Sequence, residues 1–248
     1  MSIYMTLYDI SAFSLFIVFG IIIIFLLIKL MKADKTAKPF LFTMSFFFLC
    51  ILIGQIMIYI FNKTTNFGTD IAAGEAHPMM ILRLTGYILT IIGAMPLIYI
   101  LEKKMFQKAL IKEKHIVSIV QILILGFLIT FDLLFLAFQF IDTPILLNTF
   151  LIMGLIITQT LFFVGGFFII GLRSSGEYRR NAFLVAFGYL IRVLLNVFSI
   201  LYIYRLGANP TQSNLTSLTI FMTIINILNI IAILIMAYGL LNLYKKIE

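Results

Sequence analysis

Long apolar runs alternate with short polar connections along the whole chain. A helix of about 20 apolar residues is enough to cross the hydrocarbon core of a bilayer. Seven runs reach this length, at roughly 9–30, 39–61, 79–101, 116–140, 145–172, 182–204 and 218–242. The pattern predicts an all-α protein, a polytopic bundle of seven transmembrane helices that forms a single domain over residues 1–248.

Basic residues gather in alternate connections between these runs. One set of connections holds Lys29, Lys32, Lys35, Lys38, Lys103, Lys104, Lys108, Lys112, Lys114, Arg173, Arg179, Arg180, Lys245 and Lys246. The opposite set holds only Lys63 and Arg205. Because loops rich in lysine and arginine stay in the cytoplasm, we expect the N-terminus outside and the C-terminus in the cytoplasm of a multi-pass protein of the cell membrane.

The order of connections repeats along the chain. The first three runs and the last three share a short basic loop followed by a longer outer loop, and the fourth run links the two triplets. Since one helix separates the triplets, both copies face the same way. The layout indicates a parallel 3+1+3 repeat.

Composition narrows the class of protein. Hydrophobic residues make up 62% of the chain and charged residues 11%, and the mean hydropathy is +1.15, which excludes a water-soluble domain. The net charge of +8 lies in short clusters and not along one continuous face, so the bilayer, and not nucleic acid, is the expected partner.

Residue types that carry chemistry are scarce. Cys50 is the single cysteine, and the two histidines, His77 and His115, are predicted on opposite membrane faces. No phosphate-binding glycine loop, nucleophile elbow or intramembrane cluster of metal ligands occurs. We therefore expect no metal, no cofactor and no enzymatic activity.

Polar residues inside the runs point to a binding site. In the sixth run Tyr189, Arg192, Asn196 and Ser199 are spaced i, i+3, i+7 and i+10, which places them on one helix face. A guanidinium near the middle of a membrane is costly and usually marks a functional site. Asp132 is the acidic residue that falls inside a run, and the sequence leaves open whether it pairs with Arg192 or with Arg83.

These residues predict a polar pocket that opens outward and is lined by the second to the seventh runs. Its candidate ligand-binding residues are Arg83, Tyr87, Asp132, Gln159, Tyr189, Arg192, Asn196, Asn226 and Asn229. The first run, almost wholly aliphatic, is expected to face lipid. For the amide side chains the alternative is that they only bond one helix to another.

The third run carries two further signals. Gly86, Thr90 and Ala94 repeat every four residues, a stripe of small residues that lets a neighbouring helix come close. Pro96 removes one backbone hydrogen bond in the other half of the run, so we expect a kink and a hinge there.

Short motifs give a resemblance to a known family. A basic loop leads into the second run through Lys38-Pro39-Phe40, and the third run carries Gly86-Tyr87 followed by Pro96. In these features the chain resembles the seven-helix N-terminal sensory modules of prokaryotic sensor histidine kinases. The resemblance implies a sensor; because no kinase follows in this sequence, we expect the output to belong to a separate partner.

Two other families share part of the pattern. Arg83, Tyr87 and Thr90 are similar to a run in the third helix of microbial rhodopsins, but the seventh run lacks the lysine that would bind retinal, and Gly86 stands where that pattern wants an acid. The 3+1+3 layout is similar to that of the SWEET and PQ-loop sugar carriers, without their proline-glutamine pair.

Three functions remain open on these grounds. The first is a receptor-like sensory membrane protein that binds a small molecule or lipid in the outer half of the bundle and signals through a cytoplasmic or membrane protein partner. The alternatives are a small carrier of SWEET/PQ-loop-like layout and an accessory subunit of a larger membrane complex.

Overall fold

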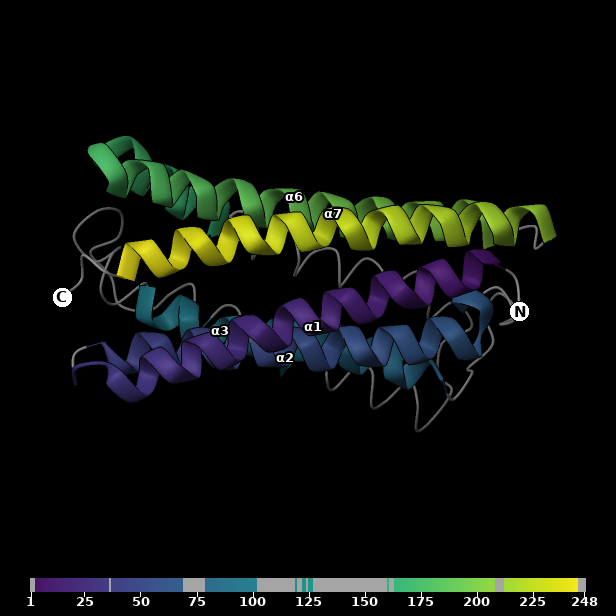
Figure 1. Cartoon of the computed structure of the whole chain (residues 1–248), viewed down its shortest axis with the longest axis horizontal. Coiled ribbons are helices and arrows are strands. Elements are labelled where there is room, and N and C mark those ends of the chain that lie inside the picture. The colour runs from purple at the N-terminus through teal and green to yellow at the C-terminus, as the bar shows by residue number, and fades with distance from the viewer. Residues whose placement is uncertain are drawn as a thin grey trace. The chain divides into compact units, whose positions relative to one another are not determined.

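The computed structural model describes most of the predicted helical regions of the chain. The described residues are 3–35, 37–68, 79–101, 163–207 and 212–244, with positions 119, 122, 123, 125, 126 and 160. Most of them are helical, in the long helices α1 (Ile3–Lys32), α2 (Lys38–Thr64), α3 (Met80–Leu101), α6 (Gly176–Gly207) and α7 (Gln212–Tyr244) (Figure 1). A short 3-10 turn, η1 (Asn66–Gly68), follows α2.

Helix lengths and compositions agree with the apolar pattern of the sequence. Four helices are long and apolar enough to cross a membrane, at Ile3–Lys32, Lys38–Thr64, Gly176–Ser199 and Ser213–Leu243, and two shorter apolar helices span Thr85–Ile100 and Phe163–Arg173. This is the make-up of a membrane helical bundle, and it confirms the all-α class. The helices extend past several predicted ends, because polar residues such as Glu177 and Ser213 continue a helix beyond its apolar part.

The seven-helix count is a finer prediction than the described residues test. Of the fourth run, 116–140, they include only positions 119, 122, 123, 125 and 126, all helical, and of the fifth run, 145–172, only position 160 and the residues from 163 onward. Leu125 packs against Ile91 of α3 and is 9% exposed. The count of seven, the orientation and the repeat stay predictions.

The chain forms two compact units. The first comprises Met1–Phe25, Phe67–Thr69 and Thr158–Glu248, and the second comprises Leu26–Asn66 and Asp70–Ile157. The first unit contains most of α1 with α6 and α7, and the second contains α2 and α3.

In the second unit, glycines bring α2 and α3 together. A Cβ added to Gly54 would lie 2.5 Å from the carbonyl oxygen of Gly86, and one added to Gly86 would lie 2.7 Å from that of Gly54. A Cβ on Gly93 would lie 2.5 Å from the Cβ of Cys50. The prediction that the stripe through Gly86, Thr90 and Ala94 admits a close helix is confirmed, and α2 is that helix.

Proline residues sit in both helices of this pair. Pro39 lies in the first turn of α2, where its missing N–H is not needed by the helix. Pro96 lies inside α3, which stays helical from Met80 to Leu101. The predicted role of Pro96 as a hinge is a statement about motion and stays a prediction.

In the first unit, α6 and α7 run antiparallel and also meet at glycines (Figure 1). A Cβ on Gly188 would lie 2.8 Å from both the oxygen of Ala232 and the nitrogen of Met236. One on Gly239 would lie 2.8 Å from the oxygen of Asn181 and from Cγ2 of Val185. Backbone atoms cannot move aside as a flexible side chain can, so these contacts fix the register of the pair.

The first helix has a packed face as well as a broad exposed surface. We expected the first run to face lipid; one face of α1 is buried, with Tyr8, Ala12, Leu15 and Phe19 each at most 3% exposed. Ser11 on this face accepts a hydrogen bond from Asn226 of α7. Other large side chains of α1, such as Ile10, Ile17 and Ile21, are 58–62% exposed, so contact of this wider surface with lipid stays a prediction. Apolar content alone does not show which face is packed, because the aliphatic residues lie all round the helix.

Substitution of the contact glycines provides a test of this packing. Gly86→Ala should lower the thermal midpoint in detergent, by the equivalent of about 1–3 kcal/mol, because its Cβ meets a backbone oxygen. Gly20→Ala in α1 is the matched control: nothing lies within 4 Å of its added Cβ, so stability should be unchanged or slightly raised. Equal effects of the two substitutions would contradict the close α2–α3 contact.

Candidate functional site

A polar seam lies along the paired helices α6 and α7. We use this name for Tyr189, Arg192, Asn196 and Ser199 on α6 together with Thr219, Thr223, Asn226 and Asn229 on α7. Six of these side chains are at most 8% exposed, namely Tyr189, Arg192, Ser199, Thr219, Asn226 and Asn229. Five of the nine predicted ligand-binding residues, Tyr189, Arg192, Asn196, Asn226 and Asn229, therefore belong to one pair of helices.

The register of α6 and α7 sets which seam residues face one another. Gly188 lies between Ala232 and Met236, and near the other end of the pair Tyr202 stacks on Phe221 with ring centroids 4.1 Å apart. Each step forward along α6 is thus matched by a step back along α7. Arg192, one turn beyond Gly188, comes level with Asn229, one turn before Ala232. By the same register, Asn196 comes level with Asn226.

Arg192 is the seam residue whose burial in a membrane costs the most free energy. It is 4% exposed and lies near the middle of a helix apolar enough to cross a membrane. Placing a charge at such a depth costs about 3 kcal/mol on insertion scales. Its electrostatic neighbour among the described residues is Tyr189, one turn away on the same face, and no carboxylate in the described ranges pairs with it.

Asn226 uses its amide to join helices. Its Nδ2 donates to Oγ of Ser11 at 3.0 Å, and Oγ of Ser11 donates to the carbonyl oxygen of Tyr8 at 2.8 Å. All three groups are buried. For Asn226, therefore, the alternative predicted for the amides, a bond from helix to helix, is the one that the structure supports.

Asn229 differs from Asn226, one turn away on α7, in its hydrogen bonding. It is 6% exposed, and its Oδ1 has no hydrogen-bond partner in the part of the chain that the structure describes. An amide oxygen buried without a partner costs about 1–3 kcal/mol. Because Asn229 comes level with Arg192, an unmet acceptor and a buried cation occupy the same layer of the seam.

Hydroxyl groups of the seam are satisfied locally. Ser199 donates to the carbonyl oxygen of Asn196 at 2.7 Å, Thr219 to that of Leu215 at 2.7 Å, and Thr223 to that of Thr219 at 2.9 Å. Such bonds back to the preceding turn leave the hydroxyl oxygen able to accept.

Aromatic rings stack on either side of the most polar part of the seam. Phe163, at the start of the short apolar helix, stacks on Tyr189 with centroids 4.7 Å apart and an interplanar angle of 21°. The stack of Tyr202 on Phe221 lies beyond Ser199. The most polar layers, those of Arg192 and Asn196, lie between these two stacks.

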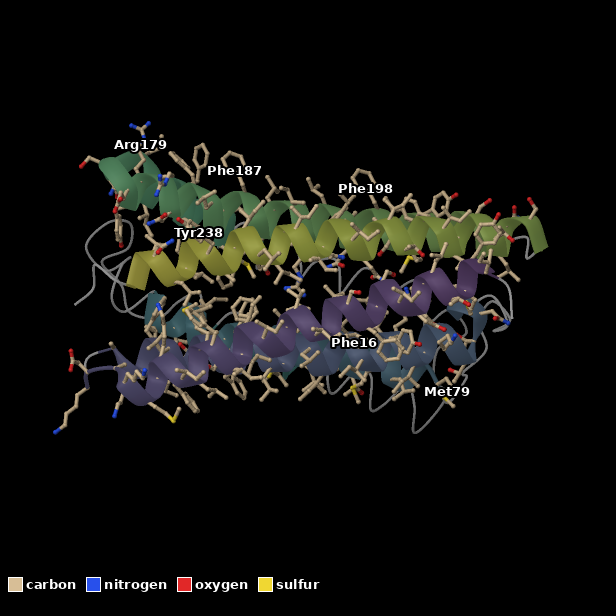
Figure 2. All side chains as sticks on the ribbon, in the orientation of Figure 1. Phe16, Met79, Arg179, Phe187, Phe198 and Tyr238 are labelled. Atoms are coloured by element: carbon tan, nitrogen blue, oxygen red, sulfur yellow. The ribbon has the colours of Figure 1, made fainter. Side chains whose placement is uncertain are left out.

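The outer faces of α6 and α7 have the opposite character. Phe187 and Phe198 of α6 point away from α7 and are more than half exposed (Figure 2). On α7 the exposed face carries Ile224, Ile227 and Ile231. Polar groups inside and apolar groups outside are what lipid surroundings favour.

The remaining predicted residues lie on another pair of helices or outside the described residues. Arg83 and Tyr87 belong to α3 in the second unit, where the Arg83 guanidinium carbon lies 5.5 Å from the ring centroid of Phe61. This cation–π contact gives Arg83 a local partner within α2 and α3. Asp132 and Gln159 lie outside the described residues, so the choice of Arg192 or Arg83 as the partner of Asp132 stays open.

Sequence reasoning missed Ser11. A lone serine in an aliphatic run was a usable signal, since a hydroxyl inside a membrane-spanning helix commonly bonds another helix or its own backbone. The described residues contain no group of three or more His, Cys, Asp or Glu side chains able to hold a metal ion. Comparison with protein-family models, curated proteins and solved structures finds no match for this chain.

The two asparagines of α7 allow a matched stability test. Asn226→Leu breaks the bond to Ser11 and should lower stability by about 1 kcal/mol. Asn229→Leu removes an oxygen that has no partner in the described residues and should leave stability unchanged or raise it. Thermal midpoints of the ligand-free protein in one detergent give the comparison, and a larger loss for Asn229→Leu would show that its oxygen is bonded.

Proposed function

We propose that the chain is a receptor-like, multi-pass protein of the cell membrane that binds a small molecule in the polar seam and signals through a separate partner. In this proposal seven helices cross the membrane, with the N-terminus outside and the C-terminus in the cytoplasm. The observation that carries the proposal is the guanidinium of Arg192, 4% exposed in the middle of an apolar helix. A guanidinium at this depth destabilises the folded protein in the membrane, and a role in ligand binding would explain why it is present.

Several features support a site and not merely a helix contact. The bond from Asn226 to Ser11 and the contacts at Gly188 and Gly239 already hold the helices together. Arg192 and the oxygen of Asn229 contribute none of these contacts. Polar groups that do not serve the fold are the ones expected to serve a ligand.

Signalling requires two conformations that differ in affinity for the ligand. Pro96 of α3 is the proposed hinge, because the carbonyl oxygen one turn earlier lacks its usual helix hydrogen bond. The basic connections, which include the exposed Arg173 and Arg180, would be the surface for the partner. The resemblance to sensory modules of histidine kinases supports the same output.

A carrier is the second candidate, and one observation favours it. The pairs α2–α3 and α6–α7 are both antiparallel and both meet backbone to backbone at glycines, Gly54 with Gly86 and Gly188 with Ala232. They occupy equivalent places in the two predicted triplets, as a parallel repeat requires. A carrier would rock these triplets about a site near mid-membrane.

Access to water distinguishes the two candidates. In a Cys50→Ala background, Asn196→Cys and Asn229→Cys are labelled from each side of sealed vesicles, with Ser213→Cys and Lys35→Cys as controls for the outer and cytoplasmic faces. A receptor predicts labelling of the seam from the outside alone. Labelling from both faces would replace the receptor by a carrier, and exchange of the two control patterns would reverse the proposed orientation.

A second experiment asks whether Asp132 is the partner of Arg192. If a ligand and not Asp132 compensates the charge, Asp132→Ala should change the thermal midpoint little, and Arg192→Met should be tolerated by the fold. A buried ion pair predicts instead a loss of about 3–5 kcal/mol for Asp132→Ala. In that case the Asp132→Leu, Arg192→Met double variant should recover much of the loss.

A further inference from the structure

Two seam residues carry complementary hydrogen-bonding groups, a cationic set of donors on Arg192 and an amide oxygen on Asn229. Arg192 carries donors only, and no carboxylate in the described ranges pairs with it. Asn229 presents an acceptor oxygen without a partner in the described residues. Both side chains are more than nine-tenths buried. The register of α6 and α7 brings the two level with each other.

These needs define the chemistry of a matching ligand. A guanidinium is best met by a carboxylate or phosphate, which can take two parallel hydrogen bonds from it. Such an anion offers no donor, so the oxygen of Asn229 requires a separate O–H or N–H group. A neutral alcohol would leave the charge of Arg192 uncompensated, and a simple fatty acid would leave the oxygen of Asn229 unmet.

We infer that the ligand of the polar seam is a small solute that carries a carboxylate or phosphate with a hydroxyl or amino group on a neighbouring carbon. The anionic group binds Arg192, and the neighbouring group donates to Oδ1 of Asn229. This assignment rests on the proposed function and specifies its ligand class.

Depth in the membrane favours a solute over a lipid headgroup of the same chemistry. At about 1.5 Å per residue, Arg192 lies roughly 24 Å along α6 from Gly176 and roughly 22 Å from Gly207. Lipid headgroups lie at the membrane surface, whereas a solute can enter between helices. The other unpartnered amide oxygen, Oδ1 of Asn181, lies two residues from the exposed Arg179 and has no buried cation beside it in sequence.

Matched pairs of small molecules test the ligand class. The full chain in detergent is titrated with leucine and 4-methylpentanoate, with 2-hydroxyhexanoate and hexanoate, and with glycerol 3-phosphate and propyl phosphate, and the thermal midpoint is followed. In at least one pair, the member with the extra donor should bind about 10-fold tighter or more, because a site built to hydrogen-bond a group rejects the analogue that lacks it.

Variants assign the two contacts separately. Arg192→Met should abolish the shift produced by both members of the pair. Asn229→Leu should keep the weaker binding of the member without the donor and remove the difference between the two. Arg180→Met and Asn242→Leu are matched controls, since they remove a positive charge and an amide about three turns along α6 and α7 from Arg192 and Asn229 and should leave both affinities unchanged.

Each result has a defined meaning. Binding that depends on Arg192 but shows no preference for the extra donor overturns the ligand class and leaves the proposed function standing. A shift that depends on both residues but arises only with phosphatidylglycerol added to the micelles assigns the chemistry to a lipid headgroup and overturns the solute. If neither the solutes nor the lipid give a shift that depends on Arg192, the inference and the proposed binding function both fail.

Discussion

Contact between helix backbones at glycine is the constraint on which the described structure depends. A Cβ on Gly188 would meet backbone atoms of Ala232 and Met236, and a Cβ on Gly54 would meet the carbonyl oxygen of Gly86. Helices in lipid gain little from hiding apolar surface, since the surrounding chains are equally apolar, so close packing is what holds them together. The same contacts set the register, and the register brings Arg192 level with Asn229.

The distribution of polar and apolar side chains over α6 and α7 follows from lipid surroundings. Seam residues such as Arg192 and Asn226 are buried, while Phe187, Phe198 and Ile224 are exposed on the outer faces. In water this distribution would be unfavourable, because it exposes large apolar side chains and hides groups that water would solvate. In a membrane it is favourable, because lipid accepts the outer faces and the interior has to satisfy every polar group.

In the proposed function, stability and ligand binding depend on different members of the seam. Asn226 donates a hydrogen bond to Ser11 and so links α7 to α1. The hydroxyl groups of Thr219 and Thr223 donate to carbonyl oxygens of the preceding turn of α7. The oxygen of Asn229 has no hydrogen-bond partner within the described residues, and the electrostatic neighbour of Arg192 among them is Tyr189. Groups that reduce stability where they stand are typical of sites that a ligand completes.

The sequence by itself determined the helical class, the location of the long apolar helices and the shared face of Tyr189, Arg192 and Asn196. Those features are local, because run length and a period of 3.6 residues can be read without knowledge of any neighbour. It also predicted the close approach at Gly86. It did not predict that α1 packs through Ser11, because an aliphatic helix carries no polar stripe to mark its buried face.

Only the tertiary structure separated Asn226 from Asn229, which are one turn apart and of one residue type. Their difference depends on which atoms of other helices lie within hydrogen-bond reach, and that is decided by the register of packed helices.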